Sequence, residues 1–244
     1  APGGNTAQTE KYNGTSWTEV NDLNTVRTNL AGAGTQTSAL AFGGGPPVKN
    51  ETEKFDGTSW TEVNNLNTAR QVLAGTGTQT AALAFGGEIT ANSASAESFN
   101  GTSWTEIAAL NSARYALGGA GTTTSALAFG GDNPRTAITE SWNGSAWSEV
   151  ADLNTARYAL AGFGSSNTSA LAVGGFNPPF ANETESWDGT SWTEIANLAT
   201  ARQQLRGSGS TAAAFVAGGI TPSKTTATEE WTVSSFTTKT FDTD

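Results

Sequence analysis

The 244-residue chain is acidic, with 22 Asp and Glu against 12 Lys and Arg and a formal net charge of -10. This charge disfavours nucleic acid and anionic membrane surfaces as partners. The absence of His and Cys excludes disulfides and nearly excludes a zinc or copper site, since carboxylates alone favour hard cations. No stretch approaches the ~20 apolar residues of a membrane-spanning helix. We therefore expect no membrane insertion, no metal and no cofactor.

One pattern repeats from end to end. Trp17, Trp60, Trp104, Trp147 and Trp192 lie 43, 44, 43 and 45 residues apart. A period in the low forties is typical of four-stranded propeller blades, whereas helical repeats show a long 3.6-residue periodicity. The spacing predicts an all-β fold.

Residues 70–110 illustrate the four strands expected in each unit. "RQVLAGTGTQ" holds a short strand of small residues, and "TAALAFGG" is an apolar strand buried on both faces. "SAESFN" and "TSWTEIAAL" predict the third and fourth strands, with Trp104 packing between blades. Asn100-Gly101 predicts a type I′ hairpin turn with positive φ at both residues.

An apolar strand ending in Gly-Gly, then an aromatic residue, a Trp and an Arg opening the next unit ("ALAFGG…ESWNGSAW…LNTAR") resembles the kelch repeat. The resemblance covers essentially the whole chain and implies a kelch-like β-propeller of four-stranded blades. The turn between the third and fourth strands is shorter than in most kelch blades. The near-identical units are similar to those of phage and environmental bacterial repeat proteins, and a consensus-designed propeller would look similar.

We expect one propeller domain over 1–244, with units at about 27–69, 70–113, 114–156, 157–201 and 202–244. Five units supply first and second strands, but six supply third and fourth strands, because both ends carry a hairpin. Five blades are favoured, with the N-terminal half-blade 1–26 closing the ring and the C-terminal hairpin 228–241 surplus. A six-bladed ring is the alternative.

The loops between second and third strands are the expected recognition surface. They vary in length and chemistry, whereas the 1–2 and 3–4 turns are nearly constant. Variable loops on a rigid scaffold are a common place for binding. The exposed candidates are Lys49, Arg135, Phe176 and Phe180.

Five repeated arginines fall on the same face, at the entry to each first strand: Arg27, Arg70, Arg114, Arg157 and Arg202. They could form a cationic mouth for carboxylate, phosphate or sulfate, and the kelch resemblance implies such a ligand-binding role. Alternatively, each could pair with the glutamate that every unit repeats and so tie the loops together. Those glutamates are Glu53, Glu97, Glu140, Glu185 and Glu229.

Catalysis is not expected, because the sequence has no nucleophile–histidine pair and no carboxylate pair that breaks the repeat. We expect a recognition module that binds a glycan or protein surface through the 2–3 loops and the arginine face, on the exterior of a virion or cell. The alternative is a structural protein forming a homo-oligomer or larger assembly, in which the surplus terminal hairpin docks by strand addition.

Overall fold

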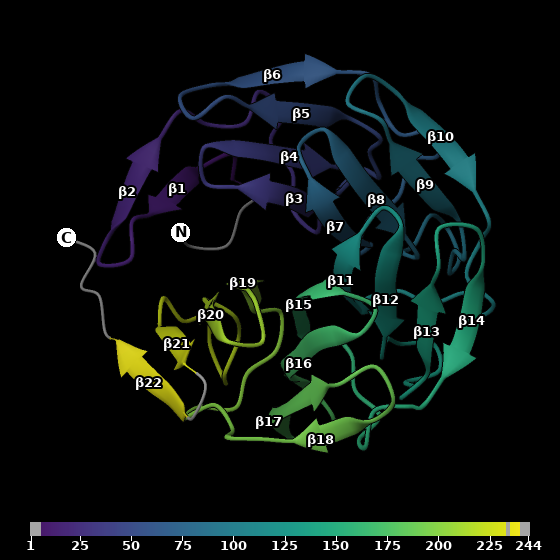
Figure 1. Ribbon diagram of the computed structural model, residues 1–244. Helices are drawn as coiled ribbons and strands as arrows, with labels where there is room; N and C mark the ends of the chain where they lie inside the picture. Colours follow the sequence, from purple (N-terminus) through teal and green to yellow (C-terminus); the bar gives the residue numbers. More distant parts are fainter. Residues whose placement is uncertain (1–5, 233–234, 240–244) are drawn as a thin grey trace. The chain divides into compact units, whose positions relative to one another are not determined.

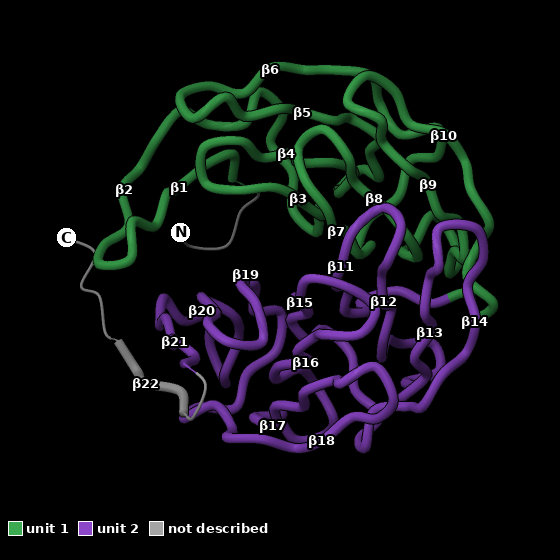
Figure 2. The backbone as a smooth tube through the Cα atoms, viewed as in Figure 1, with its two compact units in different colours: residues 1–113 green, residues 114–244 purple. Residues whose placement is uncertain are grey.

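The computed structural model describes residues 6–232 and the backbone of 235–239 (Figure 1). It is an all-β propeller of five four-stranded antiparallel blades, which confirms the predicted fold class and blade count. The chain divides into two compact units, residues 1–113 and residues 114–244 (Figure 2). Residues 1–5 and 240–244, at the outer ends of the predicted units 1–26 and 202–244, lie outside the described residues.

Unit 1 contains a two-stranded hairpin and two blades. The hairpin consists of β1 (Thr9–Tyr12) and β2 (Trp17–Val20). Blade 1 consists of β3 (Ala31–Thr35), β4 (Ser38–Phe42), β5 (Thr52–Phe55) and β6 (Trp60–Val63). Blade 2 consists of β7 (Ala74–Thr78), β8 (Ala81–Phe85), β9 (Ala96–Phe99) and β10 (Trp104–Ile107).

Unit 2 contains three blades. Blade 3 consists of β11 (Gly118–Thr122), β12 (Ser125–Phe129), β13 (Thr139–Trp142) and β14 (Trp147–Val150). Blade 4 consists of β15 (Ala161–Ser166), β16 (Ser169–Phe176), β17 (Phe180–Trp187) and β18 (Trp192–Glu194). Blade 5 consists of β19 (Arg206–Gly209), β20 (Ala213–Ala217), β21 (Thr228–Thr232) and β22 (Ser235–Lys239).

The burial of each strand follows its composition. In β8 the apolar run Ala82–Phe85 is fully buried, as expected for a strand covered on both faces. The first strands are rich in small residues because neighbouring blades approach closely there. A Cβ built on Gly75 in β7 would lie 2.5 Å from Cζ of Phe42 in blade 1, so glycine is required at this position.

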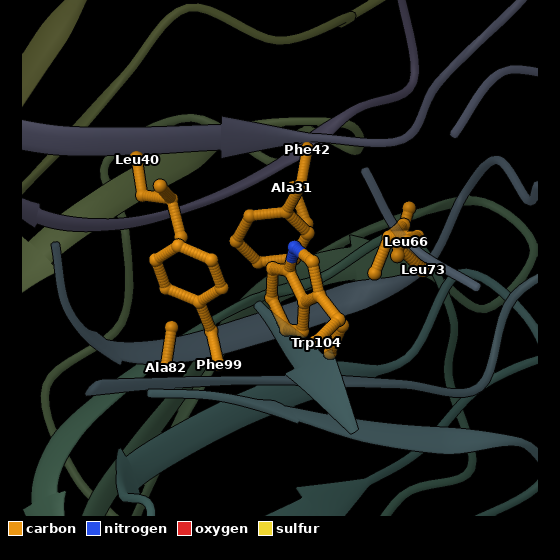
Figure 3. Packing of buried hydrophobic residues seen from close by; sticks show 9 residues of the cluster. Ala31, Leu40, Phe42, Leu66, Leu73, Ala82, Phe99 and Trp104 are labelled. Atoms are coloured by element: carbon orange, nitrogen blue, oxygen red, sulfur yellow. The ribbon is translucent and has the colours of Figure 1, made fainter. Parts of the chain in front are cut away.

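Aromatic residues pack between successive blades, as predicted. Trp104 and Phe99 of blade 2 point towards Phe42 and Leu40 of blade 1 (Figure 3). The rings of Phe42 and Trp104 meet edge to face with centroids 4.9 Å apart. In unit 2, Phe129 of blade 3 and Trp192 of blade 4 repeat this arrangement at 4.9 Å.

The hairpin turn between third and fourth strands differs from the prediction. Gly101 has a φ of 95°, but Asn100 does not adopt a positive φ, so the predicted type I′ conformation is wrong. The Asn100 side chain instead accepts hydrogen bonds from the backbone N–H groups of Thr102 and Ser103, at 2.9 and 3.0 Å. This Asx turn, which recurs at Asn13, Asp56, Asn143 and Asp188, explains why Asn or Asp precedes Gly in these turns.

The C-terminal hairpin is part of blade 5, so the prediction that it is surplus is wrong. The sheet order is β19-β20-β21-β22, and β22 pairs with β21 from Ser235 to Lys239. Backbone pairing does not depend on particular side chains, so a divergent copy of the repeat can still take its place in the sheet. The hairpin β1–β2 forms a two-stranded sheet of its own.

Candidate functional site

The five repeated arginines are buried in ion pairs within their own blades. Each is at most 2% exposed and lies against the repeated glutamate of the third strand. The N–O distances are 3.1 Å for Arg27–Glu53, 2.8 Å for Arg70–Glu97, 2.5 Å for Arg114–Glu140 and 3.0 Å for Arg157–Glu185, and Arg202 pairs with Glu229 in the same way.

Backbone carbonyls also accept hydrogen bonds from each guanidinium. In blade 1, Nη1 of Arg27 donates to the carbonyl of Glu51 at 3.2 Å, and Nη2 donates to that of Ala41 at 3.4 Å. In blade 4, Arg157 makes the equivalent bonds at 3.3 and 3.2 Å. A buried charge pair with such additional hydrogen bonds is fixed in one geometry.

The glutamate also holds the segment that enters the blade. Oε2 of Glu53 accepts from the backbone N–H and from Nδ2 of Asn24, at 2.7 and 2.9 Å. Oε2 of Glu97 accepts from the same two groups of Asn67, at 2.8 and 2.9 Å. These two Arg–Glu pairs therefore fasten the segment that enters each blade from the preceding element.

This geometry corrects the prediction of a cationic mouth at the five arginines. Burial lowers the pKa of Arg27, Arg70 and Arg157, and the adjacent glutamate opposes that shift. A guanidinium that is buried and ion-paired within its own blade is not available to a ligand. The structural alternative, in which Arg and Glu tie the loops together, describes the observed contacts.

The residue after each arginine reaches the 2–3 loop surface. It forms an isolated β-bridge with the first residue of the 2–3 loop of its unit. These bridges are Thr28–Gly45, Gln71–Glu88, Tyr115–Asp132, Tyr158–Phe176 and Gln203–Ile220. The 1–2 and 3–4 turns meet at the other end of the blade, where Gly57 lies against Thr37.

Blade 4 carries the predicted candidates Phe176 and Phe180 on an extension of its sheet. Strands β16 and β17 continue past a register shift between Val173 and Gly175 and end in the cross-strand pair Phe176–Phe180. The two rings lie edge to face with centroids 5.6 Å apart, and Tyr158 lies 5.4 Å from Phe176. All three side chains are half-buried, so part of each ring faces solvent.

Blade 3 contributes polar groups in the same unit. The hydroxyl of Tyr115 donates to Oδ2 of Asp132 at 3.2 Å. Arg135, a predicted candidate, is exposed on the same 2–3 loop and has no ion-pair partner among the residues that the structure describes. The backbone N–H of Ala159 donates to the carbonyl of Ala116 at 2.8 Å, which joins the segments that carry Tyr158 and Tyr115.

Lys49, the remaining candidate, lies in unit 1. It is half-buried, and its Nζ is 3.3 Å from Oε1 of Glu51. Its charge is therefore partly satisfied within its own loop.

Three residues that were not predicted from the sequence are added to the candidate site, because each differs from the residues at the equivalent position of the other units. Tyr115 and Tyr158 stand where the other units have Thr or Gln. Arg206 is exposed at the start of β19, where the other first strands begin with Ala or Gly. Comparison of equivalent positions between units would have revealed all three.

Within residues 6–232 and 235–239, no group of three or more Asp and Glu side chains could hold a metal ion. No helix in the same part of the chain is long and apolar enough to cross a membrane. The chain matches no protein-family model, and a search of curated proteins finds no relative.

Proposed function

We propose that the chain is a non-enzymatic recognition module that binds its ligand through the 2–3 loops of blades 3 and 4. The observation that carries the proposal is the half-exposed aromatic cluster of Tyr158, Phe176 and Phe180. Most aromatic rings among the described residues are used in packing between or within blades, whereas this cluster lies where the sheet of blade 4 extends beyond the repeat pattern. Binding sites typically combine such apolar surfaces with a few polar groups.

A glycan is the ligand favoured over a protein surface. Flat rings offer an apolar face to the C–H groups of a sugar, while the neighbouring Tyr115–Asp132 pair and Arg135 offer hydrogen-bonding groups for hydroxyls or for an acidic substituent. The cluster is small, whereas a stable protein–protein interface typically covers ~800 Å² on each partner.

The recognition role fits a kelch-like propeller acting on the exterior of a virion or cell. Three sequence landmarks of that resemblance have clear structural uses in this chain. The Trp contacts the preceding blade, and the Arg pairs with the glutamate that holds the segment entering its blade. The Gly-Gly pair directly follows the second strand in blades 1, 2, 3 and 5. The near-identical units support the relation to phage and bacterial repeat proteins, and we propose the virion or cell exterior on that ground.

The competing hypothesis of assembly through a surplus C-terminal hairpin loses its basis. Strand β22 is paired in blade 5, so the hairpin is already used within its own sheet.

A glycan-array screen of the purified chain tests the proposal, with a protein-array screen alongside. We expect saturable binding to a glycan that weakens more than about tenfold in a Phe176→Ala/Phe180→Ala variant, equivalent to about 1.4 kcal/mol. The matched control is Ile89→Ala, which removes an exposed apolar side chain from the 2–3 loop of blade 2. Binding that survives the double substitution, or that appears on the protein array alone, would contradict the glycan proposal.

A further inference from the structure

The hairpin β1–β2 has the sequence and register of the outer half of a blade. Residues 9–20 read "TEKYNGTSWTEV", against "TEKFDGTSWTEV" for residues 52–63 in blade 1. Thr9 pairs with Val20 and Tyr12 with Trp17, as Thr52 pairs with Val63 and Phe55 with Trp60. The hairpin therefore corresponds to the third and fourth strands of a blade.

The hairpin also packs on blade 1 as a preceding blade does. Nε1 of Trp60 donates to Oγ1 of Thr9 at 3.0 Å, and Nε1 of Trp104 donates to Oγ1 of Thr52 at 3.0 Å. The side chain of Lys11 reaches the carbonyl of Gly57 at 3.3 Å, as that of Lys54 reaches Gly101. Its position relative to blade 1 thus matches that of blade 1 relative to blade 2.

No described strand pairs with β1 on the side away from β2, and we call this side the open edge of β1. In each complete blade the third strand pairs with a second strand on the corresponding side. An open edge presents unpaired N–H and C=O groups that can accept an added strand.

The environment of Glu10 indicates which side chain an added strand should bring to this edge. It occupies the position of Glu53 and Glu97, which are at most 1% exposed and ion-paired with an arginine. Glu10 is exposed, and its carboxylate has no ion pair among the described residues. The repeat therefore places an acidic group here whose usual partner is the arginine that opens a first strand.

Blade 1 is less covered than the other blades at the adjoining surface. Leu30 is half-buried, whereas the equivalent leucines are at most 6% exposed: Leu73, Leu117, Leu160 and Leu205. Gly32 is exposed, and a Cβ built on it would meet only its own blade, at the carbonyl of Leu40 3.2 Å away. At the equivalent Gly75, the nearest atoms belong to the preceding blade.

We infer that the open edge of β1, together with Glu10, Leu30 and Gly32, is a docking site for one β-hairpin of the repeat's own first- and second-strand type. The hairpin would extend the β1–β2 sheet to four strands, and its arginine would pair with Glu10. Charge complementarity at Glu10 and the apolar surface at Leu30 select this occupant. The site lies in unit 1 and is independent of the proposed glycan site.

A synthetic peptide with the sequence of residues 67–87, which contains Arg70 and both strands of one repeat, tests the inference on the intact chain. We expect saturable binding of one fluorescently labelled peptide per chain. Binding should weaken more than about tenfold when Glu10→Gln is introduced in the chain, or Arg70→Gln in the peptide, since either change leaves a charge unpaired. The matched control is Glu19→Gln, because Glu19 is exposed opposite Glu10 on β2 and should not contribute.

Two further measurements keep the result unambiguous. Bound peptide should slow amide hydrogen exchange in residues 9–12, and a chain with Glu10→Arg should recover binding to a peptide with Arg70→Glu. The inference is overturned if the peptide does not bind, if a scrambled peptide binds equally, or if Glu10→Gln has no effect. A stable dimer of the chain that excludes the peptide would overturn it as well, because the site would then belong to a second copy.

Discussion

At the scale of single residues, the buried Arg–Glu pairs explain why two charged side chains recur in every unit. Removing one partner of such a pair leaves an uncompensated buried charge, which costs far more than the net contribution of the intact pair. The pairs hold the segments that enter the blades, and the function proposed above assigns recognition to residues that differ between units.

We predict that Glu97→Gln destabilises the chain by about 3–5 kcal/mol, because it leaves the buried Arg70 without its counter-charge. The matched substitution Glu10→Gln changes an exposed carboxylate at the equivalent position and should alter stability by less than about 0.5 kcal/mol. Urea unfolding measures both free energies. Equal effects of the two substitutions would show that the buried pair has no special role.

Asp188 makes the stability of its turn depend on pH. The N–H groups of Ser191 and Thr190 donate to its carboxylate and lower its pKa. Because the folded pKa lies below the unfolded value of about 4, the stabilisation is complete above that value. It is lost as the pH falls through the folded pKa.

An Asp188→Asn variant should keep both hydrogen bonds without titrating, as Asn13, Asn100 and Asn143 do in the equivalent turns. We expect the difference in urea midpoint between pH 7 and pH 3 to be smaller for this variant than for the parent chain. An Asn143→Asp variant should show the opposite change. Identical acid responses in all three proteins would contradict this account of the turn.

At the scale of the elements, close contact between first strands limits which residues they can contain. Gly75 faces Phe42, Ala31 and Gly32 of the preceding blade, whereas Gly32 has no such neighbour. The repeat keeps glycine at both positions, although only one of them is crowded.

We predict that Gly75→Ala destabilises the chain by about 1–3 kcal/mol, because its Cβ would overlap the ring of Phe42. Gly32→Ala should have a clearly smaller effect, and it serves as the control for the general effect of adding a methyl group to a first strand. Thermal or urea unfolding of the two variants gives the comparison. A cost for Gly32→Ala as large as that for Gly75→Ala would mean that its surface is already covered.

The strands of each blade could be predicted from the sequence because their signals are local. The apolar run in 81–85 and the polar–apolar alternation of "SAESFN" at 95–100 correspond to β8 and β9. The role of Arg70 could not be decided in the same way, since its contact with Glu97 joins residues 27 positions apart. The pairing of β22 was also missed, because its sequence diverges from the repeat while its backbone hydrogen bonds do not.

At the scale of the whole molecule, the residues that repeat in every unit form the scaffold, and the residues that differ between units form the candidate binding site. The Arg–Glu pairs, the interblade aromatic contacts and the 3–4 turns recur from unit to unit, so they serve the fold. Tyr158, Phe176 and Phe180 depart from the repeat on one loop surface of unit 2, and part of each ring is open to solvent. A single scaffold can thus carry different binding specificities through changes in its 2–3 loops.

The claim that the ligand binds the variable 2–3 loops and not the repeated turns is tested most directly by hydrogen exchange. Exchange rates are mapped along the chain with and without the ligand found by the array screen. We predict that the ligand slows exchange in residues 132–138 and 176–183, and leaves the turns at 143–146 and 188–191 unchanged. Protection concentrated in those repeated turns, or spread evenly over all five blades, would contradict the assignment of recognition to the variable loops.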